Sequence, residues 1–403
     1  MQNNYFVGKK RLEISEENLK ILTINNNNPL IDSSNITKNS NNGISFNSFS
    51  KFENDGLSLA NHTHWVNKIL ILEHQISRNL ISTSADGLII IYNSYPNFDP
   101  ILKIKEFNNR GVTYLAELQN STIIACSFGA IKHIKLNFTD NDKCSYTVIK
   151  YYPICKSYIS KCIELTNKNI ALICQEYNIF ILTNNEKIEN TFNENISQIK
   201  LLDYEICITI LELNENLIMT ASITDHKFNL KTENIYNLKL KNNFITFYDK
   251  NFNIISKIKN VYCSKSADNV TKLDERYFII SAELCIKEDN WDNNKGIALV
   301  DYKLYQIITF IETNKQISSL FLYENILILG DNNGFVEKYE ITEKKELKKI
   351  KSKRMHLYNI NSIIGYMVYD ENSKNNIFLT FTGSNDKTIK ISSFFDKSFD
   401  KQI

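Results

Sequence analysis

Two stretches of the chain combine a histidine, hydroxyl residues and an aspartate, the residue types of a hydrolytic triad. A histidine between a hydroxyl and a carboxylate can activate the hydroxyl as a nucleophile. This is therefore the first chemistry that the two sets suggest. Their members are His62, Ser82, Ser84 and Asp86 near the start of the chain, and His356, Thr382, Ser384 and Asp386 near its end.

A second constellation is the histidine group His62, His64 and His74, since imidazole is a common zinc ligand. No cysteine lies near it in the sequence, and His74 falls beyond a whole predicted strand from the other two. We therefore expect no metal site. The sequence also lacks the glycine-rich nucleotide-binding motifs and the HExxH zinc motif. These observations predict no cofactor and no enzymatic activity.

The composition excludes several classes of protein. The 403 residues include 47 Lys and Arg against 45 Asp and Glu, so no strong overall field draws the chain to nucleic acid or membrane. Only 11 Gly and 4 Pro are present, which excludes collagen-like and proline-rich disordered chains. We find no apolar run long enough to span a membrane and no secretion signal. A cytoplasmic location without membrane insertion is expected, with the nucleus as the alternative.

The elements that must position the candidate residues are strands. Runs of four to eight residues rich in Ile, Leu, Phe and Tyr alternate with short stretches of Asn, Asp and Gly, which is typical of strands and turns. Residues 62–93 and 356–394 share one order: His, an apolar residue, an apolar strand, a turn, a strand ending in Ser-x-Asp, and alternating apolar residues. Five weaker units lie between them. The predicted turns recur every roughly 40 to 60 residues, the spacing of four-stranded blades; they lie at Asp86, Gly129, Glu176, Asp225, Glu283, Asp331 and Asp386.

The segments LISTSADGLIIIYN and LTFTGSNDKTIKISSF resemble strand b, the tight turn and strand c of the WD40 repeat family. This resemblance implies an all-β, seven-bladed β-propeller of four-stranded antiparallel blades. It also implies that the two His, Ser/Thr and Asp sets are structural hydrogen-bonded networks, in which the aspartate fixes the turn and orients the histidine. We prefer this interpretation to the catalytic one.

The predicted propeller spans residues 44–396, between an N-terminal extension over 1–43, expected to be partly disordered, and a tail over 397–403. The last unit has only three strands before the chain ends. We expect residues 44–52 to supply the fourth strand and to close the ring, because pairing the two ends removes two exposed sheet edges.

A basic run covers residues 343–354, EKKELKKIKSKR. It could form a stripe that binds RNA or an acidic protein tail. The preferred interpretation is a Lys-rich outer strand that prevents edge-to-edge association. Its basic residues are Lys344, Lys345, Lys348, Lys349, Lys351, Lys353 and Arg354.

Two insertions, 224–243 and 287–296, are predicted between strands b and c of the fourth and fifth units. Neighbouring loops there would form a rim on one face, with Phe228, Tyr236 and Trp291 as candidate partner-binding residues. The alternative for Trp291 is a ring folded back over its own blade.

The leading hypothesis for function is a non-enzymatic scaffold that binds proteins or peptides, as a monomeric propeller within a larger complex. The alternative is a non-catalytic subunit of an RNA- or tRNA-modifying or ribosome-assembly complex, suggested by the basic run. Partner identity and the binding face stay open, because the fold alone constrains them little.

Overall fold

All the described elements are β-strands, because β-branched and aromatic runs form pleated segments and the Asn, Asp and Gly between them form turns. The computed structural model describes residues 57–73, 78–107, 110–139, 143–174, 178–184, 192–200, 205–224, 244–259, 261–263, 268–284, 294–313, 315–370 and 374–393. All of them belong to one unit, Phe49–Ile403. No helix in these ranges is long and apolar enough to cross a membrane.

The described strands form antiparallel groups of four, which we call blades and number along the chain. Blade 5 differs because two short strands, β17 and β18, share the place of its first strand beside β19. Blade 1 contains β2 (Val66–Ile71), β3 (Leu80–Ser84), β4 (Ile89–Tyr92) and β5 (Pro100–Ile104); blade 2 contains β6 (Tyr114–Glu117), β7 (Thr122–Cys126), β8 (Phe128–Phe138) and the first part of β9 (Cys144–Glu164); blade 3 contains the last part of β9, β10 (Ile170–Cys174), β11 (Asn178–Asn184) and β12 (Phe192–Lys200). Blade 4 contains β13 (Glu205–Asn214), β14 (Leu217–Thr224), β15 (Phe244–Asp249) and β16 (Ile254–Lys259); blade 5 contains β17 (Val261–Cys263), β18 (Val270–Lys272), β19 (Tyr277–Leu284), β20 (Asn294–Asp301) and β21 (Gln306–Glu312); blade 6 contains β22 (Ile317–Tyr323), β23 (Ile326–Asp331), β24 (Phe335–Ile341) and β25 (Leu347–Arg354); blade 7 contains β26 (Ile360–Asp370), β27 (Asn375–Ser384), β28 (Ile389–Ser393) and β1 (Leu57–Leu59).

Strand β9 belongs to two blades. Its residues from Cys144 to Tyr158 pair with β8, and its residues from Ile159 to Glu164 pair with β10. Blades 2 and 3 are therefore joined into one seven-stranded sheet. With β9 counted in both, the described strands make seven blades.

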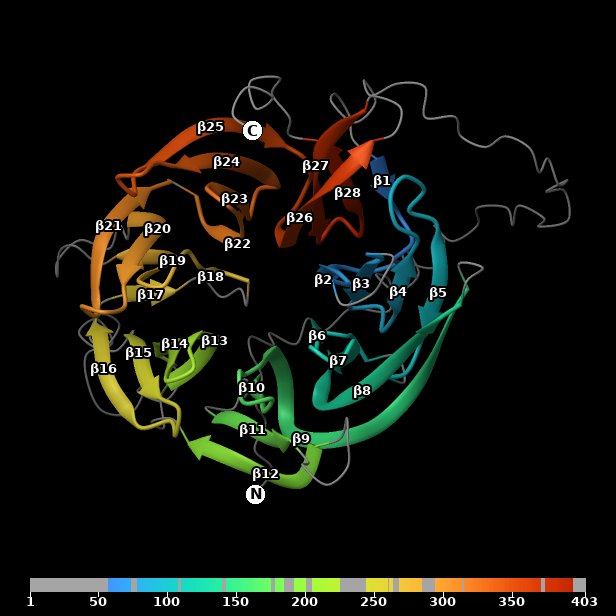
Figure 1. The fold of residues 1–403 in the computed structure, drawn as a ribbon, viewed down its shortest axis with the longest axis horizontal. Helices are drawn as coiled ribbons and strands as arrows, with labels where there is room; N and C mark the ends of the chain where they lie inside the picture. Colours follow the sequence, from blue (N-terminus) through green and yellow to red (C-terminus); the bar gives the residue numbers. More distant parts are fainter. Residues whose placement is uncertain are drawn as a thin grey trace, which may run out of the picture. The chain divides into compact units, whose positions relative to one another are not determined.

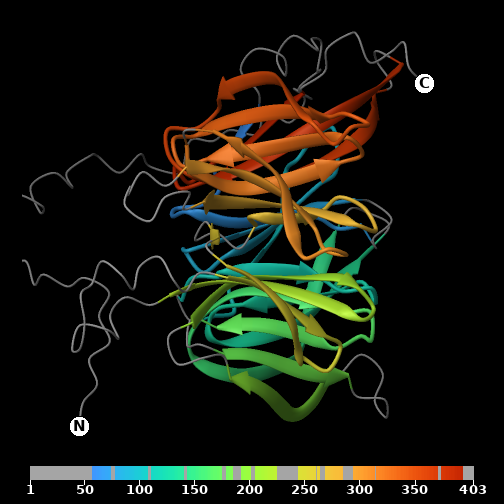
Figure 2. The same cartoon turned by 90° about the vertical axis from the view of Figure 1, so that its left-hand side faces the viewer.

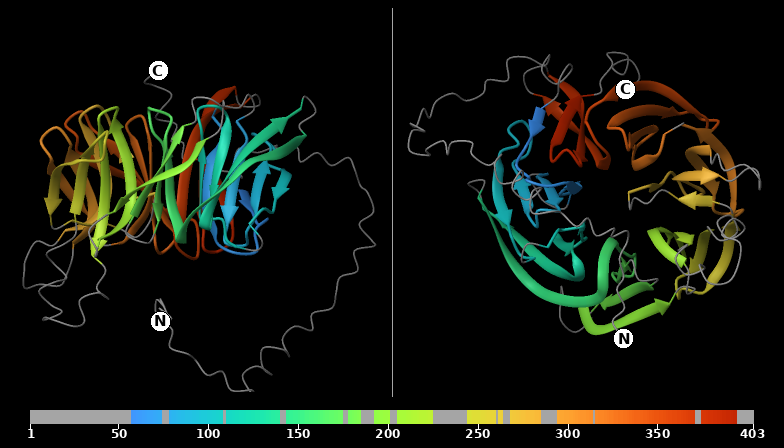
Figure 3. Two further views of the ribbon diagram at one scale, coloured as in Figure 1. Left: turned by 90° about the horizontal axis from the view of Figure 1, so that it is seen from below. Right: turned by 180° about the vertical axis from the view of Figure 1, so that it is seen from behind.

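The blades stand around a common axis, with the first strand of each innermost and the last outermost (Figure 1). The inner strands β2, β6, β9, β13, β18, β22 and β26 contact one another in that order, and β26 contacts β2. The series is thus a closed ring, which Figure 3 shows from behind. Seen from the side in Figure 2, the sheets follow one another with their faces packed together.

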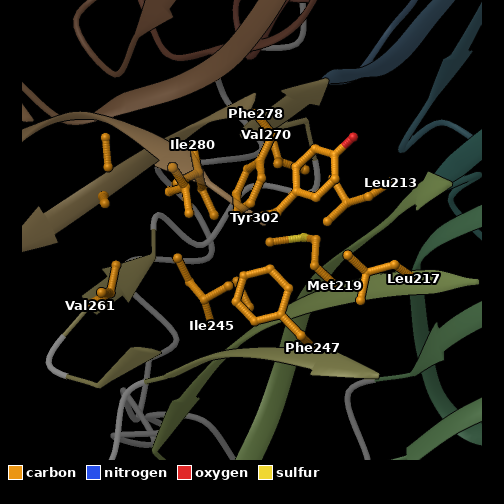
Figure 4. Packing of buried hydrophobic residues seen from close by; sticks show 14 residues of the cluster. Leu213, Leu217, Met219, Ile245, Phe247, Val261, Val270, Phe278, Ile280 and Tyr302 are labelled. Atoms are coloured by element: carbon orange, nitrogen blue, oxygen red, sulfur yellow. The ribbon is translucent and has the colours of Figure 1, made fainter. Parts of the chain in front are cut away.

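The core consists of apolar clusters between neighbouring blades. Blades 1 and 7, for example, share a cluster that includes Val66 and Ile90 of the first and Phe381 and Ile391 of the second. Figure 4 shows the cluster between blades 4 and 5. Middle strands such as β3, β7 and β10 are buried along their whole length, since each blade packs on both faces.

Hydrogen bonds between inner strands join neighbouring blades. A register shift in β2, β22 and β26 leaves one residue of each strand unpaired, and such bulges redirect a side chain. These side chains donate to a backbone carbonyl of the next blade. The bonds are Asn67 Nδ2 to Val112 O (2.8 Å), Ser318 Oγ to Ile360 O (2.6 Å) and Asn361 Nδ2 to Val66 O (2.7 Å).

A segment near the N-terminus closes the ring, but it is not the expected one. Strand β1 pairs with β28, with Leu57 opposite Ile391 and Leu59 opposite Ile389. It occupies the place that we predicted for residues 44–52, which lie outside the described residues. Leu57 and Leu59 pack on the cluster between blades 1 and 7. Three residues with two leucines that pack on this cluster pair with Ile389–Ile391 of β28, whereas the expected distance of a fourth strand from His62 had favoured 44–52.

Candidate functional site

His62 and His356 each connect a turn aspartate to a hydroxyl of the second strand of their blade. His62 Nδ1 lies 3.0 Å from Asp86 Oδ2, and its Nε2 lies 2.8 Å from Ser82 Oγ. Since a carboxylate can only accept, Nδ1 donates to it, and in a neutral ring Nε2 accepts from the hydroxyl. In blade 7 the corresponding distances are 2.8 Å from His356 to Asp386 and 2.7 Å from His356 to Thr382.

The geometry of these networks does not suit catalysis. Both hydroxyl residues, Ser82 and Thr382, are 0% exposed, so a substrate could not reach them. Partial burial opposes ionisation of Asp86, but hydrogen bonds from His62 and from the Leu88 and Thr63 amides outweigh it and lower its pKa to about 2. The same balance, with bonds from His356 and Thr388, holds the pKa of Asp386 well below its usual value. Both carboxylates thus serve as fixed acceptors.

The two networks hold out short exposed segments, Thr63–Trp65 in blade 1 and Leu357–Asn359 in blade 7, which we call the presented segments. Each turn aspartate accepts from the amide of the first residue of its segment, at 2.9 Å for Thr63 and 3.3 Å for Leu357. Ser84 and Ser384 donate their hydroxyls to the carbonyl of the second residue, and the amides of Ala85 and Asn385 donate to that of the third. The hydroxyls of Ser84 and Ser384 therefore bond to the presented segments, whereas those of Ser82 and Thr382 bond to the histidines.

The presented segments carry large apolar side chains in water. Trp65 is 50% exposed, Leu357 68% and Tyr358 60%. Blades 1 and 7 are neighbours, and Asn361, two residues after the second segment, donates to the carbonyl of Val66, directly after the first. The two segments therefore lie side by side on the face of the ring where first strands begin, which we call the presenting face.

The same face carries a further aromatic pair in blades 2 and 3. Phe128, at the turn into β8, packs edge-on against Tyr158, with ring centroids 5.0 Å apart, and Tyr158 is 47% exposed. The guanidinium of Arg110 lies 5.6 Å from the Phe128 ring. Exposed aromatic surface thus occurs on blades 7, 1, 2 and 3 of the presenting face.

A polar cluster crosses the axis of the ring. The Nζ of Lys68, from blade 1, lies 2.6 Å from the Oδ2 of Asp268. Asp268 lies two residues before β18 of blade 5. Tyr114 of blade 2 and Ser362 of blade 7 donate to the same carboxylate, at 3.2 Å and 3.1 Å. Burial opposes ionisation of Asp268, but Lys68 and Lys161 outweigh it and lower its pKa. Blades 1 and 5 lie across the ring from each other, so the bonds to Asp268 cross the central axis of the ring.

The second lysine of this cluster, Lys161, comes from the blade 3 part of β9. Its Nζ donates to Thr209 Oγ1 of blade 4 at 2.8 Å. Burial lowers the pKa of Lys161 to about 8, although Asp268 opposes the shift. The sequence did not reveal the cluster, because its members are single polar residues spread over five blades. A polar residue that recurs at the same position of the inner strand in successive blades is the signal that could have found it.

Blade 6 replaces the histidine with a lysine. Lys315 lies 3.1 Å from Asp331 Oδ2 and 3.7 Å from Glu337 Oε1, and its Nζ lies 3.7 Å from the Phe335 ring centroid. Asp331 accepts from the amides of Asn333 and Phe335, so it fixes the turn as expected. A search for histidine alone misses this variant.

The basic run forms the turn before β25 and β25 itself, the outermost strand of blade 6. Lys345 pairs with Asp274 at 2.7 Å and Lys349 with Glu337 at 2.7 Å. Arg354 donates to the carbonyls of His356 and Leu357. Lys344, Lys348, Lys351 and Arg354 are exposed.

The loop residues proposed for partner binding, Phe228, Tyr236 and Trp291, lie outside the described residues, as does His74. Within the described ranges, no group of three or more His, Cys, Asp or Glu side chains could hold a metal ion. The six cysteines whose side chains are described are free thiols.

Comparison with known proteins identifies the fold. The sequence matches no protein family and no curated protein. Among solved structures, the WD40 β-propeller domain of Doa1 superposes with a TM-score of 0.58 at 13% identity, over 85% of this chain and 97% of that one. Sqt1 of Saccharomyces cerevisiae gives 0.56 at 10% identity, over 85% and 100%, and a chain of the mitotic checkpoint complex gives 0.60 at 7%, over 92% and 100%. The expectation of an all-β propeller is confirmed: this chain has the fold of a WD40 β-propeller.

Proposed function

We propose that this chain is a non-enzymatic scaffold that binds proteins or peptides within a multiprotein complex. The observation that carries the proposal is the pair of presented segments. Their backbones are fixed by the two His–Asp networks, and their large apolar side chains are exposed. A surface that is ordered before binding loses less conformational entropy when a partner docks.

Two further observations support the proposal. Exposed aromatic side chains, which are favoured binding anchors, continue along the presenting face as far as Tyr158. The similar structures include WD40 propellers, one of them a chain of a multiprotein checkpoint complex. In such folds, rigid blades position loops and short segments for a partner.

The test is quantitative affinity capture with mass spectrometry. We expect partners recovered by the wild-type chain to be lost from a Trp65→Ala, Tyr358→Ala double variant, because truncating an interface anchor costs about 2 kcal/mol or more in binding. Tyr369→Ala is the matched control: Tyr369 is also 60% exposed, but it lies at the opposite end of β26 from Tyr358. Equal loss in the control and the double variant would contradict the proposal.

The rim of residues 224–243 and 287–296, with Trp291 as its anchor, stays a prediction. It predicts that Trp291→Ala reduces partner recovery without lowering the melting temperature. The RNA-binding alternative has less support, since two of the seven basic residues that suggested it are in ion pairs with Asp274 and Glu337.

A further inference from the structure

Among the described strands, β25 is the open outer edge of blade 6. In blade 6 the strand order is β22, β23, β24, β25, and no described strand pairs with the outer side of β25. Six of its eight residues are exposed. An edge strand of this length offers a row of backbone N–H and C=O groups to another extended chain.

The side chains of β25 select the charge of such a chain. The strand contains Lys348, Lys349, Lys351, Lys353 and Arg354 and no acidic residue. Near its start, Lys348 lies opposite Glu340, and Lys349 is paired with Glu337. Further along, Lys351 lies opposite another lysine, Lys338 of β24, and like charges directly opposite each other repel. A carboxylate placed beside this half of the strand would be attracted to Lys351 and Arg354, both of which are exposed.

The edge geometry favours a peptide over a nucleic acid. Side chains of β25 alternate between the two faces of the sheet on either side of a register shift at Ile350, so the outer backbone runs between two rows of basic groups. An extended peptide can pair with that backbone and bring carboxylates at alternate positions to one of these rows, whereas a nucleic acid meets only the charges. Ile350, 41% exposed between the two lysine pairs, offers an apolar contact as well.

The edge is continuous with the presented segment of blade 7. Arg354 ends β25, and its guanidinium donates to the carbonyl of Leu357 at 3.4 Å. A chain that follows β25 toward Arg354 therefore arrives beside the exposed side chains of Leu357 and Tyr358.

We propose that an extended acidic segment of a protein partner adds to β25 as a further strand of blade 6 and reaches Leu357 at its end. This inference rests on the proposed function, since it names the chemistry of the partner. The lysines exclude neutral and basic strands, so the edge resists non-specific pairing while accepting an acidic one.

The test measures binding of a fluorescent peptide of about eight residues that alternates Glu and Val. We expect Lys351→Glu, Lys353→Glu to raise its Kd about tenfold or more, and binding to weaken with salt. The control, Lys250→Glu, Lys259→Glu, changes the charge equally at exposed positions on blade 4 and should leave the Kd nearly unchanged. The same peptide with alternate amides N-methylated should not bind, because it cannot pair with the edge.

Several results would overturn the inference: equal effects of the two double variants, tight binding of the N-methylated peptide, or binding of a uridine oligonucleotide in place of the acidic peptide. Partner capture separates this inference from the proposed function. If capture depends on Trp65 and Tyr358 but not on Lys351 and Lys353, the strand addition is wrong and the proposed function stands. If it depends only on the lysines, the presented segments are not the binding surface.

Discussion

Lys68 and Asp268 form an ion pair across the axis of the ring, although 200 positions separate them in the chain. The two residues belong to blades 1 and 5, and the Asp268 carboxylate also accepts from Tyr114 and Ser362. One side chain thus connects four blades. Asp268 lies two residues before β18, outside the β18–β19 ladder, which begins at Val270.

Removal of Asp268 should destabilise the whole ring. Asp268→Ala leaves Lys68 and Lys161 buried without their carboxylate, and breaking a buried ion pair typically costs about 3–5 kcal/mol. We expect a loss of that order in the free energy of unfolding, measured by urea denaturation. Asp99→Asn, at an exposed position in blade 1, is the control and should change little. A loss below about 1 kcal/mol for Asp268→Ala would show that the ion pair does not hold the ring.

Lys161 should make the free energy of unfolding change with pH in the alkaline range. Its pKa is lowered to about 8, below the usual value of 10.5, so between these values the unfolded chain binds more protons than the folded one. Stability from this group therefore rises with pH across that window. We expect the free energy of unfolding of Lys161→Met, relative to that of the wild type, to fall by about 2–3 kcal/mol between pH 8 and pH 10.5. Denaturation of both proteins at several pH values measures this difference, and a constant difference would contradict it.

The turn aspartates should contribute to acid denaturation. The folded pKa of Asp86 is about 2, below its usual 3.8, so its stabilisation is present above about pH 4 and is lost as the pH falls toward 2. Asp86→Asn should lower stability at pH 7 by about 1–3 kcal/mol. The gap between variant and wild type should then close below pH 4. A gap that persists at pH 2 would show that the charge is not the cause.

The closing strand should matter more than its three residues suggest. Leu57 and Leu59 pack on the cluster between blades 1 and 7, so Leu57→Ser with Leu59→Ser exposes that cluster and the edge of β28. We expect a clear drop in melting temperature, since each leucine contributes up to about 1.5–3 kcal/mol by burial. Leu304→Ser, at a leucine that is 54% exposed, is the matched control. Equal melting of the two variants would assign ring closure to another segment.

The strong repeats at the two ends of the chain could be predicted from the sequence, because the structure of each is determined by a pattern of residues within that repeat. The order of histidine, hydroxyl and aspartate in the first repeat returns in the last one, although 24 positions separate His62 from Asp86 and 30 separate His356 from Asp386; in both sets the histidine bonds to the aspartate. The basic run also lies on an outermost strand. These features depend on residues within one blade, where side-chain alternation and turn chemistry decide the structure.

The rest depends on contacts between blades, which no local pattern encodes. Asp268 appears in the sequence as an ordinary polar residue, and only the ring brings Lys68 to it. The closing segment was misplaced because any short apolar strand near the N-terminus could cover β28. Trp65 takes no part in the network predicted around His62, but its place three residues after that histidine puts it in a presented segment. That signal, an apolar residue between the histidine and the first strand, also applies to Leu357 and Tyr358.

Strand β9 has a consequence for where the chain could be cut and rejoined. It runs without a break for 21 residues, from the rim of blade 2 to the axis of blade 3 (Figure 1). New termini placed between blades 6 and 7, after Arg354, would open a connection that lies outside the strands. Termini placed between blades 2 and 3 would instead cut through a continuous strand, whose halves pair with β8 and with β10. A circularly permuted chain that begins at blade 3 should therefore be less stable than one that begins at blade 7, because blades 2 and 3 are the pair of described blades that one strand joins into a single sheet.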